Sequence, residues 1–125
     1  METFVTFEIG KKLKEKGFIL NYNLYGYKPI YTDTNTIALI WNIGAYEKDY
    51  FGENIPCPTI SHVLKWLRDY HNIHISIDVT EFDDESWMWS IYDIETGDIR
   101  PYDGLASTYE KAVMNGIEYV INNLI

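Results

Sequence analysis

Residues 73–80 carry the strongest pattern in the chain, a strict alternation of apolar and polar side chains. The apolar members are Ile73, Ile75, Ile77 and Val79, and the polar members are His74, Ser76, Asp78 and Thr80. A period of two with β-branched residues is typical of a strand that has one buried face. The sequence therefore predicts a strand here.

Two further strands are predicted after this one. A polar turn at 83–86 precedes a returning strand over about residues 87–94. Another polar turn at 95–98 precedes residues 99–102, which predict a short edge strand because Pro101 cannot donate a ladder hydrogen bond. The sequence thus predicts either a hairpin or a three-strand antiparallel meander.

Apolar residues at helical spacing predict two helices before this region. The first begins near Thr3 or Thr6 and ends at Gly17, and its apolar residues are Val5, Ile9 and Leu13. The second begins near Pro58 and extends to about residue 71, with the Trp66 ring packed against that of Tyr70 four residues later.

A third helix is predicted to begin at Ser107, where Ser107 and Glu110 form a capping box. Its apolar face continues to Leu124, which is typical of a core helix. Helices and strands in this order favour the α+β class, with a small antiparallel sheet packed against about three helices.

The segment at about 21–56 is rich in tyrosine, and its structure is open at this stage. Phe18–Leu20 and Ile37–Trp41 are candidate strands, and the residues around them suit either a long loop or an irregular hairpin. A loop of this length is functional, mobile or wrongly assigned, and the sequence does not choose among these. With 125 residues, of which 46% are hydrophobic, the chain is expected to form a single domain over residues 1–125.

The register of the predicted hairpin decides where its tryptophans lie. A four-residue turn at 83–86 pairs Phe82 with Trp87, and Ile75, Ile77 and Val79 then form the core face. Trp87 and Trp89 lie on the other face, beside Asp78 and Thr80. That face is either covered by the segment 18–56 or used by a protein partner or a second copy of the chain. A slip of one residue would exchange the two faces.

Charge disfavours direct binding of nucleic acid. Lys and Arg total 10 against 19 Asp and Glu, a net charge of −9, whereas direct nucleic-acid binding requires clustered cations. The lysines collect near the end of the first predicted helix, where cations complement the helix dipole.

Residues that carry chemistry are few, and the sequence predicts no catalytic, cofactor-binding or metal-binding residue. His62, His71, His74 and Cys57 lack the second cysteine and the spacing of a zinc site. The acidic stretch 93–98 resembles a calcium loop superficially but lacks its ligand spacing, so a hairpin turn is expected. Cys57 has no base near it in the sequence, and an enzyme is therefore disfavoured.

A cytoplasmic location is expected. Residues 1–5 contain no basic and apolar pattern of a secretory signal, and the longest apolar run, Ile37–Trp41, is far shorter than a membrane helix. The single cysteine excludes an internal disulfide.

Three blocks of the sequence carry a family resemblance: Ile9–Phe18, Cys57–Arg68, and the closing block Ser107–Ala112 with Gly116–Val120. The second block has the pattern apolar-Pro-Thr-x-x-x-Val-Leu-x-Trp-Leu-Arg. The chain resembles small uncharacterised proteins of Bacteroides-type bacteria and their phages or mobile elements. The resemblance implies a bacterial or phage origin and a cytoplasmic location, and it implies no catalytic residues.

The leading hypothesis is a non-enzymatic protein-binding module that uses exposed aromatic side chains, with either a protein partner or a homodimer. The candidate partner-binding residues are Tyr25, Tyr27, Tyr31, Trp41, Tyr46, Phe82, Trp87 and Trp89. Two alternatives stay open: an acidic phage-type modulator that mimics nucleic-acid charge, and an enzyme with a carboxylate or Cys57 site.

Overall fold

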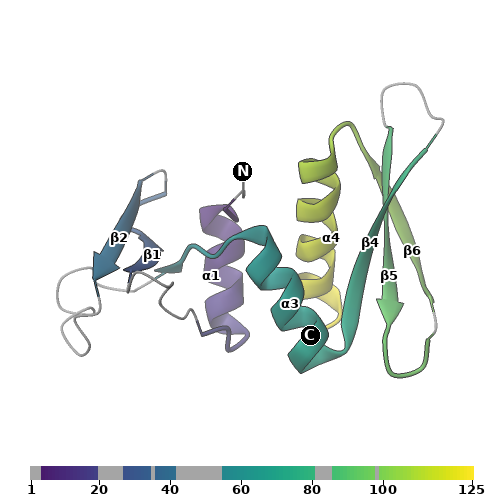
Figure 1. Cartoon of the computed structure of the whole chain (residues 1–125), viewed down its shortest axis with the longest axis horizontal. Helices are drawn as coiled ribbons and strands as arrows, with labels where there is room; N and C mark the ends of the chain where they lie inside the picture. The colour runs from purple at the N-terminus through teal and green to yellow at the C-terminus, as the bar shows by residue number, and fades with distance from the viewer. Residues whose placement is uncertain (1–3, 20–26, 35, 42–54, 81–85, 98) are drawn as a thin grey trace. The chain divides into compact units, whose positions relative to one another are not determined.

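The computed structural model describes residues 4–19, 27–34, 36–41, 55–80, 86–97 and 99–125 (Figure 1). This part of the chain contains three helices and two small three-strand antiparallel sheets. The predicted α+β class is therefore confirmed, although the sequence predicts one such sheet rather than two. The chain divides into an N-terminal unit, Phe4–Thr59, and a C-terminal unit that contains Ile60–Ile125.

Helix α1 (Phe7–Glu15) begins and ends where its sequence signals predict. The side chain of Thr6 accepts a hydrogen bond from the backbone N–H of Ile9 at 3.3 Å and thereby caps the helix. Gly17 has φ 87°, the left-handed conformation that commonly follows a helix. The predicted apolar stripe is confirmed, because Val5, Ile9 and Leu13 are all buried.

The sheet of the N-terminal unit consists of β1 (Tyr27–Tyr31), β2 (Ile37–Trp41) and β3 (Ile55–Pro56) in the order β2-β1-β3. The strand predicted at Ile37–Trp41 is confirmed, whereas residues 18 and 19 lie in no strand and residue 20 is outside the described part. The Tyr-rich segment thus contains a regular hairpin between β1 and β2.

Helix α1 lies directly against β3, and Gly10 permits the close approach. A Cβ atom at Gly10 would lie 2.2 Å from the carbonyl oxygen of Pro56 and 3.3 Å from Cγ2 of Ile55. The chain before α1 is fixed to the chain after β3, since the N–H of Val5 donates to the carbonyl of Pro58 at 3.0 Å. The helix and the sheet are therefore joined by backbone contacts as well as by apolar packing.

The C-terminal unit consists of α3 (Ile60–His71), β4 (Ile73–Val79), β5 (Trp87–Asp93), β6 (Ile99–Ala106) and α4 (Tyr109–Asn123). Its strands form the predicted antiparallel meander in the order β4-β5-β6, with β6 at an edge. Helix α4 lies along this sheet and contacts all three strands, while α3 contacts β4 and α4 (Figure 1). The helices thus form a layer over one sheet.

The third predicted helix begins one residue later than its capping box implies. Thr108 is the N-cap of α4, and its side chain accepts a hydrogen bond from the N–H of Lys111 at 3.1 Å. Because Lys111 rather than Glu110 then occupies the third helical position, the reciprocal Ser107–Glu110 capping is wrong. Ser and Thr are both good N-cap residues, so the sequence alone does not choose between neighbours.

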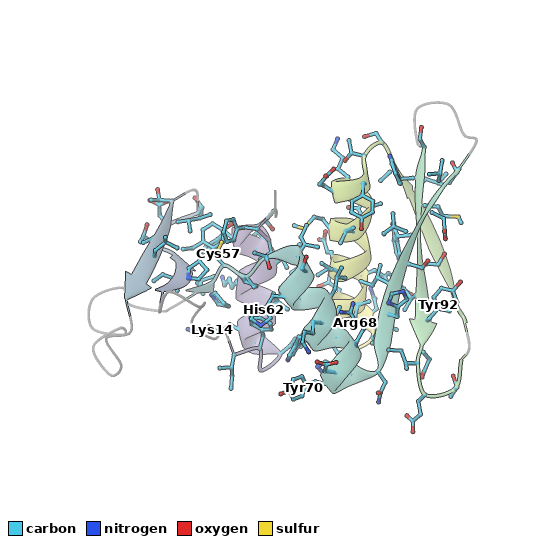
Figure 2. All side chains as sticks on the ribbon, viewed as in Figure 1. Lys14, Cys57, His62, Arg68, Tyr70 and Tyr92 are labelled. Atoms are coloured by element: carbon cyan, nitrogen blue, oxygen red, sulfur yellow. The ribbon has the colours of Figure 1, made fainter. Side chains whose placement is uncertain are left out.

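The ring contact predicted on α3 is also wrong. Trp66 packs edge-to-face against His71, with ring centroids 4.6 Å apart, and Tyr70 points away from the helix into solvent (Figure 2). A spacing of four residues permits a contact, but the direction of the side chain decides whether it forms.

The register predicted for the β4–β5 hairpin is wrong by three residues. Val79 pairs with Trp87, Ile77 with Trp89 and Ile75 with Ile91, so the connection extends from 80 to 86. Because the error is an odd number, β5 presents its tryptophans on the same face as the isoleucines of β4, which is the reverse of the prediction.

Burial of the indole explains why the longer connection is preferred. Trp89 is 4% exposed in this register. A buried aromatic side chain of about 200 Å² contributes about 5 kcal/mol at about 25 cal/mol per Å². Lengthening the loop from residues 83–86 to 80–86 costs less than about 0.6 kcal/mol in closure entropy. The hydrophobic gain therefore decides the pairing.

Candidate functional site

The structure describes the side chains of three of the eight aromatic residues that the sequence nominates for partner binding. Trp89 and Tyr31 are buried, and Trp87 is half-buried with its ring 5.5 Å from that of Tyr109. Outside the described part lie Tyr25, Tyr46 and Phe82, together with the side chains of Tyr27 and Trp41. The prediction that Trp87 and Trp89 lie on a face away from the core is wrong, because it depended on the predicted register. In the observed register both side chains are on the face that the helices cover.

Tyr31 is held in the interior of the N-terminal unit by polar and aromatic contacts. Its hydroxyl donates a hydrogen bond to the carbonyl of Val5, and its ring lies edge-to-face with Phe7 at a centroid distance of 5.6 Å. Burial, together with the adjacent Cys57, raises the pKa of the Tyr31 hydroxyl well above its usual value. Tyr31 is therefore a neutral, structural hydrogen-bond donor.

Cys57 directly follows β3 in the chain and is buried in the same interior, together with Tyr31 and Ile55 (Figure 2). Burial raises the pKa of its thiol, and the hydrogen bond with Tyr31 lowers that pKa to a smaller extent. A buried, protonated thiol is a poor nucleophile, since the thiolate is the reactive species. These properties argue against catalysis by Cys57.

Carboxylate and histidine side chains are the remaining groups that could hold a metal ion. No group of three His, Cys, Asp or Glu side chains with metal-binding geometry occurs among the described residues. One carboxylate oxygen of Asp93 accepts hydrogen bonds from the N–H groups of Glu95 and Thr96, at 3.0 and 3.2 Å. This arrangement, with Gly97 at φ 76°, is a hairpin turn, as the sequence predicts for residues 93–98.

An apolar recess opens beside α1 in the N-terminal unit. It has a volume of about 390 Å³, its floor includes Phe7, Tyr31 and Ile55, and Lys11 and Asp33 are at its margin. An apolar floor with one charge of each sign suits a neutral side chain of a partner better than a charged substrate.

The outer edge of β2 has the most distinctive surface in the described part of the N-terminal unit. Side chains of Ile37 and Leu39 are 41% and 60% exposed, although β2 contains no charged residue. Strand β2 pairs with β1 on one side, and no described strand pairs with it on the other. An uncharged edge strand with exposed apolar side chains is a template for strand addition.

The backbone of β2 has alternate groups directed outward. The carbonyl of Pro29 accepts a hydrogen bond from the N–H of Cys57 on the β3 side, so Pro29 and its partner Leu39 do not bond to each other. In an antiparallel pair bonded and non-bonded residues alternate, so Ile37, opposite Tyr31, is also non-bonded. The N–H and C=O groups of Ile37 and Leu39 therefore point away from β1.

Sequence reasoning missed this edge, although a signal for it was present. The run Ile37–Trp41 is apolar and predicts a strand, and it contains neither a charged residue nor a proline. Edge strands in natural proteins usually contain such residues, which block pairing with other chains. An uncharged run in a small sheet is thus a usable indication of an interaction edge.

Comparison of the chain with models of protein families, with curated proteins and with solved structures gave no match. The resemblance to small bacterial and phage proteins therefore stays a prediction. No helix in the described part of the chain is long and apolar enough to cross a membrane.

Proposed function

We propose that the chain is a protein-binding module that adds an extended segment of a partner protein to the outer edge of β2. The observation that carries this proposal is the outward direction of the Ile37 and Leu39 backbone groups, combined with the exposure of their side chains. In strand addition, main-chain hydrogen bonds supply affinity and alternate side chains supply specificity.

The charge of the chain indicates the chemistry of the partner. A net charge of −9 attracts a basic segment and opposes association of two copies of the same chain. The partner segment is therefore expected to alternate apolar residues with Lys or Arg, and its apolar side chains cover Ile37 and Leu39.

A peptide-display selection tests this chemistry. Short linear peptides selected on the wild-type chain should show the alternation and should bind the Leu39→Lys variant at least about tenfold more weakly, or about 1.4 kcal/mol. The charged side chain both removes apolar contact and repels the basic segment. Val79→Lys is the matched control, because Val79 is 71% exposed on an edge strand of the other sheet and should retain full binding.

Amide hydrogen exchange distinguishes strand addition from simple side-chain docking. The amides of Ile37 and Leu39 should exchange rapidly in the free chain and become protected when a selected peptide binds, while the amide of Ala38, bonded to β1, should change little. Peptides that leave the Leu39 amide unprotected refute the proposal. Peptides that ignore Leu39→Lys but dissociate at high salt also refute it and point instead to the charge-mimic alternative.

A further inference from the structure

The recess beside α1 lies on the same face of the N-terminal sheet as the exposed side chain of Ile37. Residues directly opposite each other in an antiparallel sheet have their side chains on one face. Tyr31 pairs with Ile55 in β3 and with Ile37 in β2. Tyr31 and Ile55 belong to the floor of the recess. Ile55, Tyr31 and Ile37 therefore form one apolar row across the sheet, and Ile37 is the outer end of this row.

Helix α1 covers one end of the row and leaves the other end open. The helix contacts β3, and the ring of its Phe7 lies against that of Tyr31. Tyr31 and Ile55 are buried, whereas Ile37 is exposed. Leu39, two residues further along β2, faces the same way and is more exposed still. The row is thus closed at β3 and β1 and open at β2, where an added strand would extend it.

A strand that pairs with β2 places one of its side chains in this row. The backbone N–H and C=O of Ile37 point away from β1, so a residue of an antiparallel segment exchanges both hydrogen bonds with Ile37 and has its side chain on the same face. Neighbouring strands are about 4.8 Å apart, so the backbone of this residue is about 10 Å from that of β1. Only a long or aromatic side chain extends across Ile37 into the recess.

The lining of the recess favours a neutral ring at this position. The rings of Phe7 and Tyr31 are edge-to-face, and Phe7 is only half-buried, so a third ring can pack against its exposed part. Lys11 and Asp33 place one charge of each sign at the margin, which disfavours a charged side chain of either sign. The recess has a volume of about 390 Å³, within the range of about 300–1,000 Å³ that is typical of ligand pockets.

We propose, on the basis of the proposed strand addition, that the recess is the anchor pocket of the β2 edge and binds an aromatic side chain of the added segment opposite Ile37. The residue opposite Leu39 is further from the recess and is aliphatic. The residue between these two faces away from α1 and carries the basic side chain. Because the segment is antiparallel to β2, the residue opposite Leu39 precedes the aromatic residue, and the segment has the order aliphatic, basic, aromatic.

Three acetylated, amidated peptides test the side chain and its position. The first is Ser-Lys-Val-Lys-Phe-Lys-Ser, the second exchanges its Val and Phe, and the third has Leu in place of Phe. The first peptide should bind at least about fivefold more tightly than each of the others, which is about 1 kcal/mol. In NMR spectra of its complex, the phenylalanine ring of the peptide should show NOEs to the rings of Phe7 and Tyr31.

Two matched variants assign the aromatic preference to the recess. Phe7→Leu keeps an apolar floor but removes the ring, and it should reduce the preference for the Phe peptide over the Leu peptide to about twofold or less. Phe4→Leu is the control, because Phe4 belongs to the same unit and is 40% exposed outside the recess, and it should keep the full preference. Urea denaturation of both variants shows that each is folded.

The outcomes separate the anchor pocket from strand addition itself. If no peptide protects the Leu39 amide from hydrogen exchange, strand addition is wrong and the anchor pocket fails with it. If the peptides protect Leu39 but all three bind equally, or the exchanged order binds as tightly as the first, the anchor pocket alone is overturned. An aromatic preference that Phe7→Leu and Phe4→Leu change equally also overturns it.

Discussion

Replacing Gly10 by alanine tests whether the contact between α1 and β3 is as tight as the structure indicates. The added Cβ atom would lie 2.2 Å from the carbonyl oxygen of Pro56. Carbon and oxygen atoms normally approach no closer than about 3.3 Å, so the helix and the strand must separate by about 1 Å. The carbonyl belongs to the backbone and cannot rotate away as a side chain can.

Two opposing terms set the size of the effect. Alanine is a better helix former than glycine by about 1 kcal/mol, which favours the variant. Overpacking against fixed atoms costs about 3 kcal/mol. We therefore expect a net loss of about 2 kcal/mol in the free energy of unfolding, which corresponds to a fall in Tm on the order of 10 °C for a small unit.

Gly116→Ala on α4 is the matched control, because it has the same gain in helix propensity but a softer neighbour. Its Cβ atom would lie 2.9 Å from Cγ2 of Ile75, a side-chain methyl group that can move by a few tenths of an ångström. This variant should remain within about 1 kcal/mol of wild type. Urea denaturation followed by circular dichroism compares the two. If Gly10→Ala is as stable as Gly116→Ala, the reasoning about the backbone contact is wrong.

Burial of Cys57 and partial burial of His71 each change a property that can be measured. The Cys57 thiol should react with a disulfide reagent on the order of 100-fold more slowly in the folded chain than in urea, because burial encloses it and raises its pKa; equal rates would contradict its burial. Burial lowers the pKa of His71 below its usual value of about 6.5, so the unfolded chain binds this proton more tightly than the folded chain does. The stability that the neutral His71 side chain contributes is therefore complete above about pH 6.5, and this contribution declines as the pH falls below that value. His71→Gln should lose less stability between pH 7 and pH 5 than wild type does in urea unfolding, and an unchanged loss would exclude His71 as the cause.

Local signals predicted the helices and the meander well, because each signal concerns residues that are close in sequence. The limits of α1 follow from Thr6 and Gly17, which determine a helix start and a helix end through their own backbone hydrogen bonds and conformation. The alternation in β4 likewise fixes which of its residues face the helices. These features depend on local structure, so a single sequence is enough to find them.

The register of β5 depends on the balance between the entropy cost of closing the loop and the free energy gained by burying Trp89. Local patterns in the sequence do not reveal this balance. The shortest loop gives the wrong register, because the free-energy cost of three more loop residues is small compared with the gain from burying Trp89. The register also decides whether Trp89 can belong to a surface site. Because Trp89 is buried in the observed register, the reason for proposing it as a surface residue no longer applies. The room that Gly104 leaves for the Trp89 indole is also beyond sequence reasoning, because these two residues come together only when β5 and β6 pair.

The other three sheet edges differ from the β2 edge, because each has a feature that hinders strand addition. Strand β3, at the other edge of the same sheet, is two residues long and ends in Pro56. Strand β4 carries the exposed Asp78, and β6 contains Pro101. Each of these features is a known means of preventing unwanted pairing at an edge. Among the described strands, only β2 is an edge strand without a charge, a proline or a shortened length, and Leu39 at its centre is exposed. A chain that protects three edges and leaves the fourth apolar is consistent with selection for a partner at that fourth edge.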